Sequence, residues 1–219
     1  MTESASSREA ILAAIRMATV TTAKEAGWLH ESYQGLPRAY HHAGRLERDA
    51  CLSLLIERLR EYGAEIAETT PEALPDAIRA QLASTGKRRF AAPAALPANW
   101  LVPGFEWHVD NDLPTDEIEH CEGVLTGAAA AIADSGTIVL HHGPQEGRRL
   151  LTLLPDIHVC VLLASQVVET LPEYFRQCIA PPALVTWISG PSATADIEMT
   201  RIKGVHGPRY LHVILVRNN

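Results

Sequence analysis

The sequence predicts an α/β fold, a sandwich of helices around a central, mostly parallel sheet, with a helical appendage at its N-terminus. Between residues 64 and 93, a strand pattern, an amphipathic helix pattern and a second strand pattern follow one another. That alternation is typical of parallel strands joined by a crossover helix. In the second half, several short runs rich in β-branched apolar residues alternate with turns, as expected for strands buried on both faces.

The N-terminal appendage is expected to span residues 1–45 and the α/β domain residues 46–219. Residues 7–25 carry apolar side chains at helical spacing behind a serine that can cap the helix. Residues 27–44 are rich in aromatic residues, histidine and helix breakers, which predicts a loop. Residues 47–63 predict an amphipathic helix that ends at a glycine.

The remaining elements follow in chain order. A strand is expected at 64–68 and another at 88–93. Between them lies a helix over 70–86, with Thr70 as its cap and Pro71 in its first turn. One more helix is expected around 169–178. The strands of the second half are predicted at 123–127, 137–142, 157–164, 183–189 and 210–216.

The composition restricts the class of partner. The chain has 219 residues, of which 47% are hydrophobic and 21% charged, an ordinary globular composition. Its 19 basic and 26 acidic residues give a net charge of −7, so the protein repels polyanions as a whole. Nucleic acid and anionic membranes are therefore not expected as partners. Neither a signal peptide nor an apolar run of membrane-spanning length is apparent, which predicts a cytoplasmic protein.

The cysteines argue against an intrinsic metal centre. Four of them lie far apart without any CxxC spacing, which excludes a local iron–sulfur or zinc-ribbon cassette: Cys51, Cys121, Cys160 and Cys178. No HExxH occurs either, and the strand-borne His158 and His212 are more typical of core histidines. We expect no metal site.

A first concentration of polar residues lies between the last two predicted strands. Gly190, Pro191 and Ser192 form a turn at the carboxyl end of the strand 183–189. In open α/β sheets, ligands bind at that edge. Ser192 or Thr194 can also cap a short helix, whose free N–H groups favour an anion.

The same segment continues into a sharp bend. His206 and Gly207 lie on this bend and Arg209 follows it. Asp196 and Glu198 are two residues apart, so a helix would point them to different sides and a strand would align them. They do not form a clear acid/base pair. The segment is either a hydrogen-bonded, hairpin-like connection or a site for a ligand or partner.

A second concentration of polar residues lies on both sides of the predicted strand 137–142. Arg148 and Arg149 could hold a carboxylate or phosphate, or could form a solvated basic pair. A small anion is predicted where the 190–196 turn meets Arg209 and Arg148. A turn leads into the strand 137–142, and it either faces a ligand or is an Asx-turn. It consists of Asp134, Ser135, Gly136 and Thr137.

Long stretches of the sequence resemble one family. The segments "CEGVLTGAAAAIADSGTIVL", "GRRLLTLLPDIHVCVL" and "ISGPSATADIEMTRIKGVHGPRYLHVILV" strongly resemble the LUD-domain family, specifically its LutC-like (YkgG-type) lactate utilization proteins. The resemblance is dense over the last 100 residues and moderate in the middle. Residues 1–45 resemble the family only in the length of this segment and in the motif "LPRAY". The chain has "ADSGT" where the family usually has "AETGT", so a direct catalytic role at Asp134 is not implied.

The resemblance implies a fold related to the NagB/RpiA/CoA-transferase class. It also implies membership of a three-protein system that oxidises L-lactate to pyruvate, in which cysteine-rich partner subunits carry the iron–sulfur clusters. This chain would then contribute assembly or the binding of a small anion, which is lactate or a phosphate-like group. It would hold no cofactor of its own, and no catalytic residue can be assigned. The alternative is a stand-alone enzyme of the same fold, acting on a small carboxylate, an acyl-CoA or a sugar phosphate.

Overall fold

The structure is a computed structural model. It describes residues 7–19, 23–37, 39, 43–178, 180, 182–191, 193–195, 201–204 and 206–217. The chain divides into two units, residues 1–40 and 41–219, whereas the expected boundary lay between residues 45 and 46. None of the helices in the described segments is long and apolar enough to cross a membrane.

The residues described in the first unit form two helices, α1 (Ser7–Ala18) and α2 (Ala23–Gln34). The first confirms the helix predicted near the N-terminus, but the second occupies much of the predicted loop. That loop prediction was wrong because only Gly27 disfavours a helix within α2, and one interior glycine costs only about 1 kcal/mol. The breakers Gly35 and Pro37 follow the helix and do not interrupt it.

The second unit is built on a six-stranded sheet of order β1-β12-β7-β4-β2-β3, in which every pair of neighbours is parallel. The predicted crossover unit contains β1 and β2, which are not neighbours, because β12, β7 and β4 lie between them. The central β7 and β12 are nearly buried throughout, since their apolar residues can be covered on both faces only inside the sheet. The strands span Glu65–Thr69 (β1), Arg89–Pro93 (β2), Glu106–Asp110 (β3), Gly123–Thr126 (β4), Ile157–Leu163 (β7) and Tyr210–Val216 (β12).

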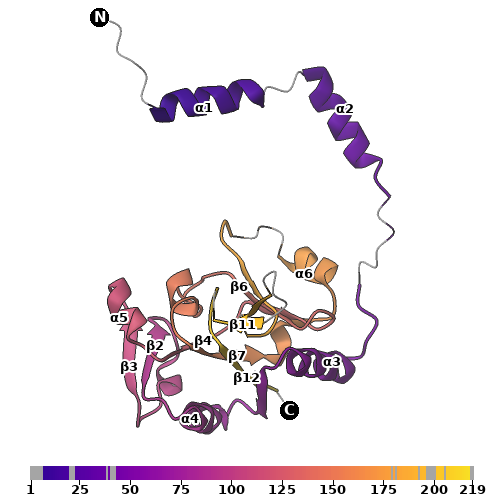
Figure 1. The fold of residues 1–219 in the computed structure, drawn as a ribbon. Helices are drawn as coiled ribbons and strands as arrows, with labels where there is room; N and C mark the ends of the chain where they lie inside the picture. Colours follow the sequence, from indigo (N-terminus) through magenta and orange to yellow (C-terminus); the bar gives the residue numbers. More distant parts are fainter. Residues whose placement is uncertain are drawn as a thin grey trace, which may run out of the picture. The chain divides into compact units, whose positions relative to one another are not determined.

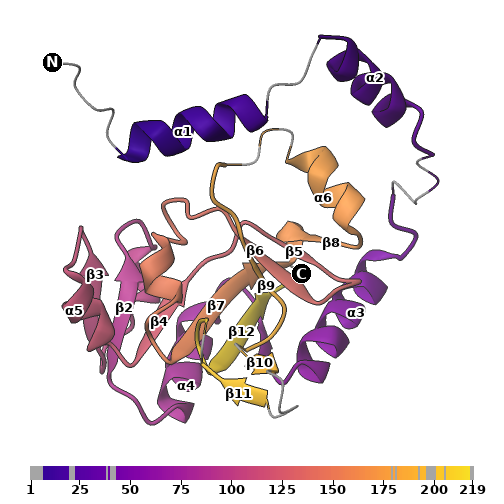
Figure 2. The same ribbon diagram turned by 45° about the horizontal axis from the view of Figure 1, so that its top comes forward.

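A smaller sheet of order β8-β5-β6-β9 accompanies the large one (Figure 2). Its strands are β5 (Ala130–Ile132), β6 (Thr137–Leu140), β8 (Val167–Val168) and β9 (Thr186–Ile188). β6 pairs antiparallel with both β5 and β9. A separate antiparallel pair, β10 (Ala193–Ala195) and β11 (Arg201–Lys203), follows β9 along the chain.

Within the described part of the second unit there are four helices, α3 (Arg48–Glu61), α4 (Leu74–Ser84), α5 (Thr115–Glu119) and α6 (Leu171–Gln177). The same described residues include the 3₁₀ turns η1 (Ala98–Trp100), η2 (Arg149–Thr152) and η3 (Ala164–Gln166). The predicted helices at 47–63 and 169–178 are confirmed as α3 and α6. The helix predicted over 70–86 begins at Leu74, with Pro75 in its first turn, so the cap at Thr70 was wrong. The later start places Leu74, Ile78 and Leu82 together in the core.

The core lies on both faces of the large sheet because side chains alternate along each strand. Cys160 and Leu162 of β7 pack with α3 and with β5 and β6 of the small sheet. Val159 and Val161 face the opposite side, where they pack with α4. Figure 1 shows α4 and β6 on opposite sides of β7 and β12. This alternation puts His158 on the same face as Cys160, toward the small sheet.

Candidate functional site

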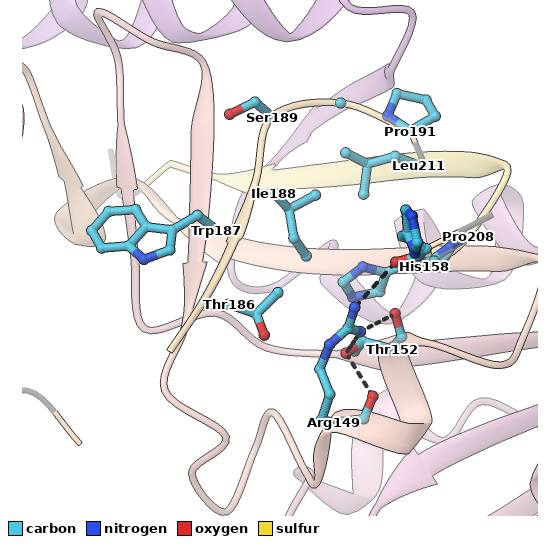
Figure 3. A pocket seen from close by; sticks show the side chains of 13 residues that line it. Arg149, Thr152, His158, Thr186, Trp187, Ile188, Ser189, Pro191, Pro208 and Leu211 are labelled. Atoms are coloured by element: carbon cyan, nitrogen blue, oxygen red, sulfur yellow. Dashed lines mark hydrogen bonds between the residues drawn. The ribbon is translucent and has the colours of Figure 1, made fainter. Parts of the chain in front are cut away.

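A cavity of about 260 Å³ lies where the small sheet meets the amino-terminal ends of β7 and β12 (Figure 3). His158 of β7 and Leu211 of β12 are directly opposite each other in the strand register, and both line it. β9 and the turn after it form another wall. The full lining consists of Arg149, Thr152, His158, Thr186, Trp187, Ile188, Ser189, Gly190, Pro191, His206, Gly207, Pro208 and Leu211.

The position of this cavity differs from the predicted one. The sequence argument placed a ligand at the carboxyl ends of parallel strands. β9, however, belongs to the small sheet and pairs antiparallel with β6. The carboxyl end of β9 therefore meets the amino-terminal ends of β7 and β12, and the general rule for open parallel sheets does not apply here.

His158 and Thr152 are the most deeply buried polar residues of the cavity, each with 1% of its surface exposed. His158 Nε2 lies 2.7 Å from Thr126 Oγ1, and that hydroxyl donates to Gly127 O at 2.8 Å. A carbonyl oxygen can only accept, so the Thr126 proton goes to Gly127 and the Thr126 oxygen accepts from His158 Nε2–H. Nδ1 is then the ring atom with a free lone pair.

That lone pair has no hydrogen-bond partner within the described part of the chain. Burial, together with the charges on Arg149 and His212, lowers the pKa of His158 to about 3, so the ring is neutral at pH 7. A buried acceptor without a donor costs about 1–3 kcal/mol. His158 is a buried core histidine, as the sequence predicts, but only one of its two ring nitrogens is hydrogen-bonded.

Arg149 supplies the positive charge of the cavity. It is half-buried, and burial lowers its pKa from the usual value. Its guanidinium donates to Thr152 O at 2.7 Å, to Thr152 Oγ1 at 3.2 Å and to His206 O at 3.1 Å. All of these acceptors are neutral, and no carboxylate pairs with Arg149 among the residues that the structure describes. Figure 3 shows the guanidinium beside the His158 ring.

A chain of hydroxyl groups joins the two predicted polar concentrations. Ser189, on the cavity wall, lies 2.8 Å from Thr137 through their hydroxyl oxygens. Thr137 in turn lies 2.8 Å from Ser135 Oγ. Asp134 and Ser135 are exposed, whereas Gly136, at φ +59, packs against Arg58. The 134–137 turn thus supports the cavity wall from behind without lining it.

Four predicted residues do line the cavity, namely Gly190, Pro191, His206 and Gly207. Gly190 has φ +86, and an added Cβ would lie 2.5 Å from Tyr62 Cβ. Gly207 has φ +151. Both glycines therefore have backbone angles that other residues rarely adopt.

The two predicted arginines are engaged elsewhere. Arg209 Nε and Nη2 donate to the two carboxylate oxygens of Asp156 at 2.9 and 2.6 Å. Arg148 holds Asp110 in the same bidentate way at 2.9 Å for both bonds, and also donates to Leu113 O. Neither lines the cavity. Their predicted anion-binding role stays a prediction.

The rest of the first polar concentration is only partly covered by the structure. Ser192, Asp196 and Glu198 lie outside the described residues. Thr194 lies in β10, so the short helix expected at this point is a strand of a hairpin instead. The hairpin reading of the 189–209 segment fits this pair of strands. Ligand binding by these four residues stays a prediction.

The sequence does not identify His158 and Arg149 as residues of one site. It indicates a core residue at His158 and one member of a basic pair at Arg149. The signal for His158 was its place in an apolar strand with Cys160 and Leu162 on the same face. No local pattern showed that this face opens onto a cavity, because the opposing wall comes from residues 186–191 and 206–208.

Within the described segments, no group of three or more histidine, cysteine, aspartate or glutamate side chains is placed to hold a metal ion. The described cysteines are all free thiols. The cavity therefore offers an uncompensated cation, a neutral imidazole acceptor, hydroxyl groups and apolar walls. Such a set can bind a small anion that also carries a hydrogen-bond donor.

Comparison with known proteins gives consistent matches. The model of the LUD domain family matches residues 98–216. The Lactate utilization protein C of Deinococcus radiodurans is 41% identical over 175 residues, 78% of this chain and 82% of that protein. The Lactate utilization protein C of Bacillus subtilis is 30% identical over 190 residues, 77% of this chain and 79% of that protein.

A solved structure is also similar. The crystal structure of a DUF162 family protein from Deinococcus radiodurans matches with a TM-score of 0.67 and 36% sequence identity. The match covers 78% of this chain and 99% of that one. Together with the six-stranded parallel sheet, this similarity confirms the predicted α/β fold class.

Proposed function

Because the chain belongs to the LUD-domain family, we propose that it is a LutC-like subunit of an iron–sulfur system that oxidises L-lactate to pyruvate. The observation that carries this proposal is the 41% identity with a Lactate utilization protein C over 78% of the chain. The redox centres belong to cysteine-rich partner subunits in this proposal. The chain itself contributes assembly and the binding of a small anion.

The cavity supports the anion-binding part. Arg149 is a half-buried cation whose described partners are neutral oxygens. A desolvated guanidinium of this kind attracts a carboxylate more strongly than one already paired, as Arg148 and Arg209 are. A volume of about 260 Å³ suits a molecule of a few heavy atoms better than a coenzyme.

Two exposed apolar surfaces support the assembly part. On α1, Ile11 and Ile15 are 60% and 52% exposed and lie one helical turn apart. On the second unit, Phe175 and Trp187 are 49% and 42% exposed, with ring centroids 6.1 Å apart. Exposed aromatic and aliphatic side chains in such groups mark interaction surfaces.

The direct test is L-lactate oxidation by the co-expressed cysteine-rich subunits with and without this chain. We expect oxidation to require the chain and the chain to co-purify with those subunits. Unchanged oxidation in its absence would refute the proposal. Turnover of a small carboxylate, acyl-CoA or sugar phosphate by the chain alone would favour a stand-alone enzyme of the same fold.

The role of α1 in assembly can be tested within the full chain. Replacing Ile11 and Ile15 together by aspartate should weaken co-purification by about 10-fold or more, because two buried aliphatic contacts are each worth about 1.5 kcal/mol or more. Ala13→Asp is the matched control, since residue 13 lies on the opposite side of α1. Equal co-purification of both variants would exclude α1 from the interface.

A further inference from the structure

We propose that the cavity binds a small 2-hydroxycarboxylate, with Arg149 holding the carboxylate and His158 Nδ1 accepting a hydrogen bond from the 2-hydroxyl group. The hydroxy-acid class is inferred from the cavity alone. The choice of L-lactate as the member to test rests on the proposed function.

The hydroxyl requirement follows from the hydrogen bonds of His158. Nε2–H is used by Thr126, whose own proton is used by Gly127. The remaining Nδ1 can only accept. His158 lines the cavity, and this ring nitrogen is itself buried. A ligand that fills this space without a donor would leave Nδ1 unbonded, whereas a hydroxyl group would satisfy it.

The carboxylate requirement follows from Arg149. Its described bonds use the Nη1 and Nη2 groups, and its Nε–H donates to none of the described groups. The contacts with Thr152 and with His206 O fix the guanidinium beside the imidazole. A cation and a neutral acceptor held side by side match the adjacent carboxylate and hydroxyl of a 2-hydroxy acid.

The rest of the wall fits a short hydrocarbon group. Ile188 and Leu211 present apolar side chains to the same space, and Pro191 and Pro208 add rigid apolar surface (Figure 3). Contact of a methyl group with them stabilises the complex by about 25 cal/mol for each Å² of apolar surface that is removed from water. Ser189 and Thr186 also line this space, and their hydroxyl groups are hydrogen-bonded to Thr137 and His142.

The experiment is calorimetric titration of the purified full chain at pH 7 with L-lactate, propionate, pyruvate and inorganic phosphate. Propionate and pyruvate keep the carboxylate and the three-carbon size but lack the hydroxyl donor. We expect L-lactate to bind about 10-fold more tightly than either, the effect of one hydrogen bond to a buried acceptor. Equal affinities, phosphate binding as tightly as lactate, or no heat from any carboxylate would overturn the inference.

Two variants assign the contacts. Arg149→Met should weaken the binding of all three carboxylates by about 10-fold or more, because it removes the cation and keeps an unbranched side chain. His158→Leu should weaken L-lactate alone, to the level of propionate, since only the hydroxyl contact is lost. The Thr126 hydroxyl keeps its bond to Gly127 in that variant. An unchanged ratio of lactate to propionate affinity in His158→Leu would contradict the assignment.

Arg79→Ala is the matched control. It removes the same charge from a guanidinium of α4 that pairs with Asp76 and does not line the cavity, so affinities should not change. The binding experiment and the L-lactate oxidation experiment test the two proposals separately. A chain that is required for L-lactate oxidation but binds no lactate retains the proposed function and loses this inference. A chain that binds lactate but is dispensable for oxidation does the reverse.

Discussion

The immediate neighbours of His158 decide which of its nitrogens is available. Thr126 is held by Gly127 O, so it accepts the Nε2 proton and leaves Nδ1 unprotonated. Burial opposes a second proton on the ring, and so do the charge on Arg149 and, when it is protonated, that on His212. A residue type that usually titrates near neutral pH is thereby kept as a neutral acceptor.

This environment makes stability depend on pH. The pKa of His158 is about 3 in the folded chain and 6.5 for an unperturbed histidine, so the unfolded state binds the proton first as pH falls. The stability linked to this residue is fully present above pH 6.5 and is lost between pH 6.5 and 3, by about 1.4 kcal/mol per pH unit. Urea unfolding of wild type and His158→Leu from pH 7 to pH 4 measures the difference.

The leucine variant should show a shallower loss over that range, since it has no proton to take up at this position. Parallel stability curves for the two proteins would mean that His158 titrates normally in the folded state. Long-range ¹H–¹⁵N spectra provide a separate check, because they should show Nε2 protonated and Nδ1 unprotonated throughout.

Gly190 allows a second prediction about a single residue. Its φ of +86 is strained for any other residue, and Tyr62 Cβ lies 2.5 Å from where a Cβ would be. Gly190→Ala should therefore lower the free energy of unfolding by about 2–3 kcal/mol, the sum of backbone strain and a steric clash. The measurement is denaturant unfolding.

Gly63 is the matched control for this substitution. It has nearly the same φ, +85, but no atom within 4 Å of an added Cβ. Gly63→Ala should therefore show the backbone strain alone, about 1 kcal/mol. If the two variants lose equal stability, the contact with Tyr62 contributes nothing.

Regular elements could be predicted from sequence where the pattern was long and uniform. The runs that became β7 and β12 are apolar and β-branched over seven residues each, so they were recognised. β5 and β8 have three and two residues, too few for any periodicity to be read. They are strands because β5 pairs with β6 on one side and with β8 on the other, which is tertiary information.

The capping of α6 connects this helix to the start of the domain. Glu173 Oε2 accepts from the N–H groups of Glu169 and Thr170 at 3.0 Å, which completes a capping box. Glu169 Oε2 in turn accepts from the N–H groups of Arg45 and Leu46 at 2.6 Å. The Glu173 carboxylate thus binds the main chain at the start of α6, and the Glu169 carboxylate binds the main chain just before α3.

Removing the first of these carboxylates should weaken the whole unit. Glu173→Ala leaves two N–H groups at the start of α6 unbonded, and we expect a loss of about 1 kcal/mol, or about 2–4 °C in melting temperature. Gln177→Ala, at an exposed position in the last turn of the same helix, is the control and should change little. Equal melting temperatures of the two variants would show that solvent replaces the cap.

The site as a whole arises from segments that are distant in sequence. Arg149 and His158 meet residues 186–191 and 206–211 only because β7 and β12 are adjacent and β9 lies in a second sheet. The sequence could predict the turn glycines and the polar character of these segments, since both are local properties. It could not predict that Arg148 and Arg209 find carboxylates while Arg149 does not. That distinction depends on the packing of non-local partners.

The distribution of thiols over the molecule predicts its metal content. Cys51 lies on α3, Cys160 on β7 and Cys178 just after α6, and Cys121 follows α5. Burial raises the pKa of Cys121 to about 11 and that of Cys160 to about 12, so neither supplies a thiolate at neutral pH. Iron–sulfur clusters require several thiolates at one place.

We therefore expect the chain purified alone under anaerobic conditions to be colourless and free of iron, and visible absorbance to appear only with the cysteine-rich partner subunits. Iron analysis and absorbance spectra of the isolated chain and of the co-purified complex make the comparison. The isolated chain should remain colourless after incubation with iron and sulfide, because the buried thiols of Cys121 and Cys160 stay protonated. Stoichiometric iron in the isolated chain would contradict this and would move the redox centre onto the subunit that carries the cavity.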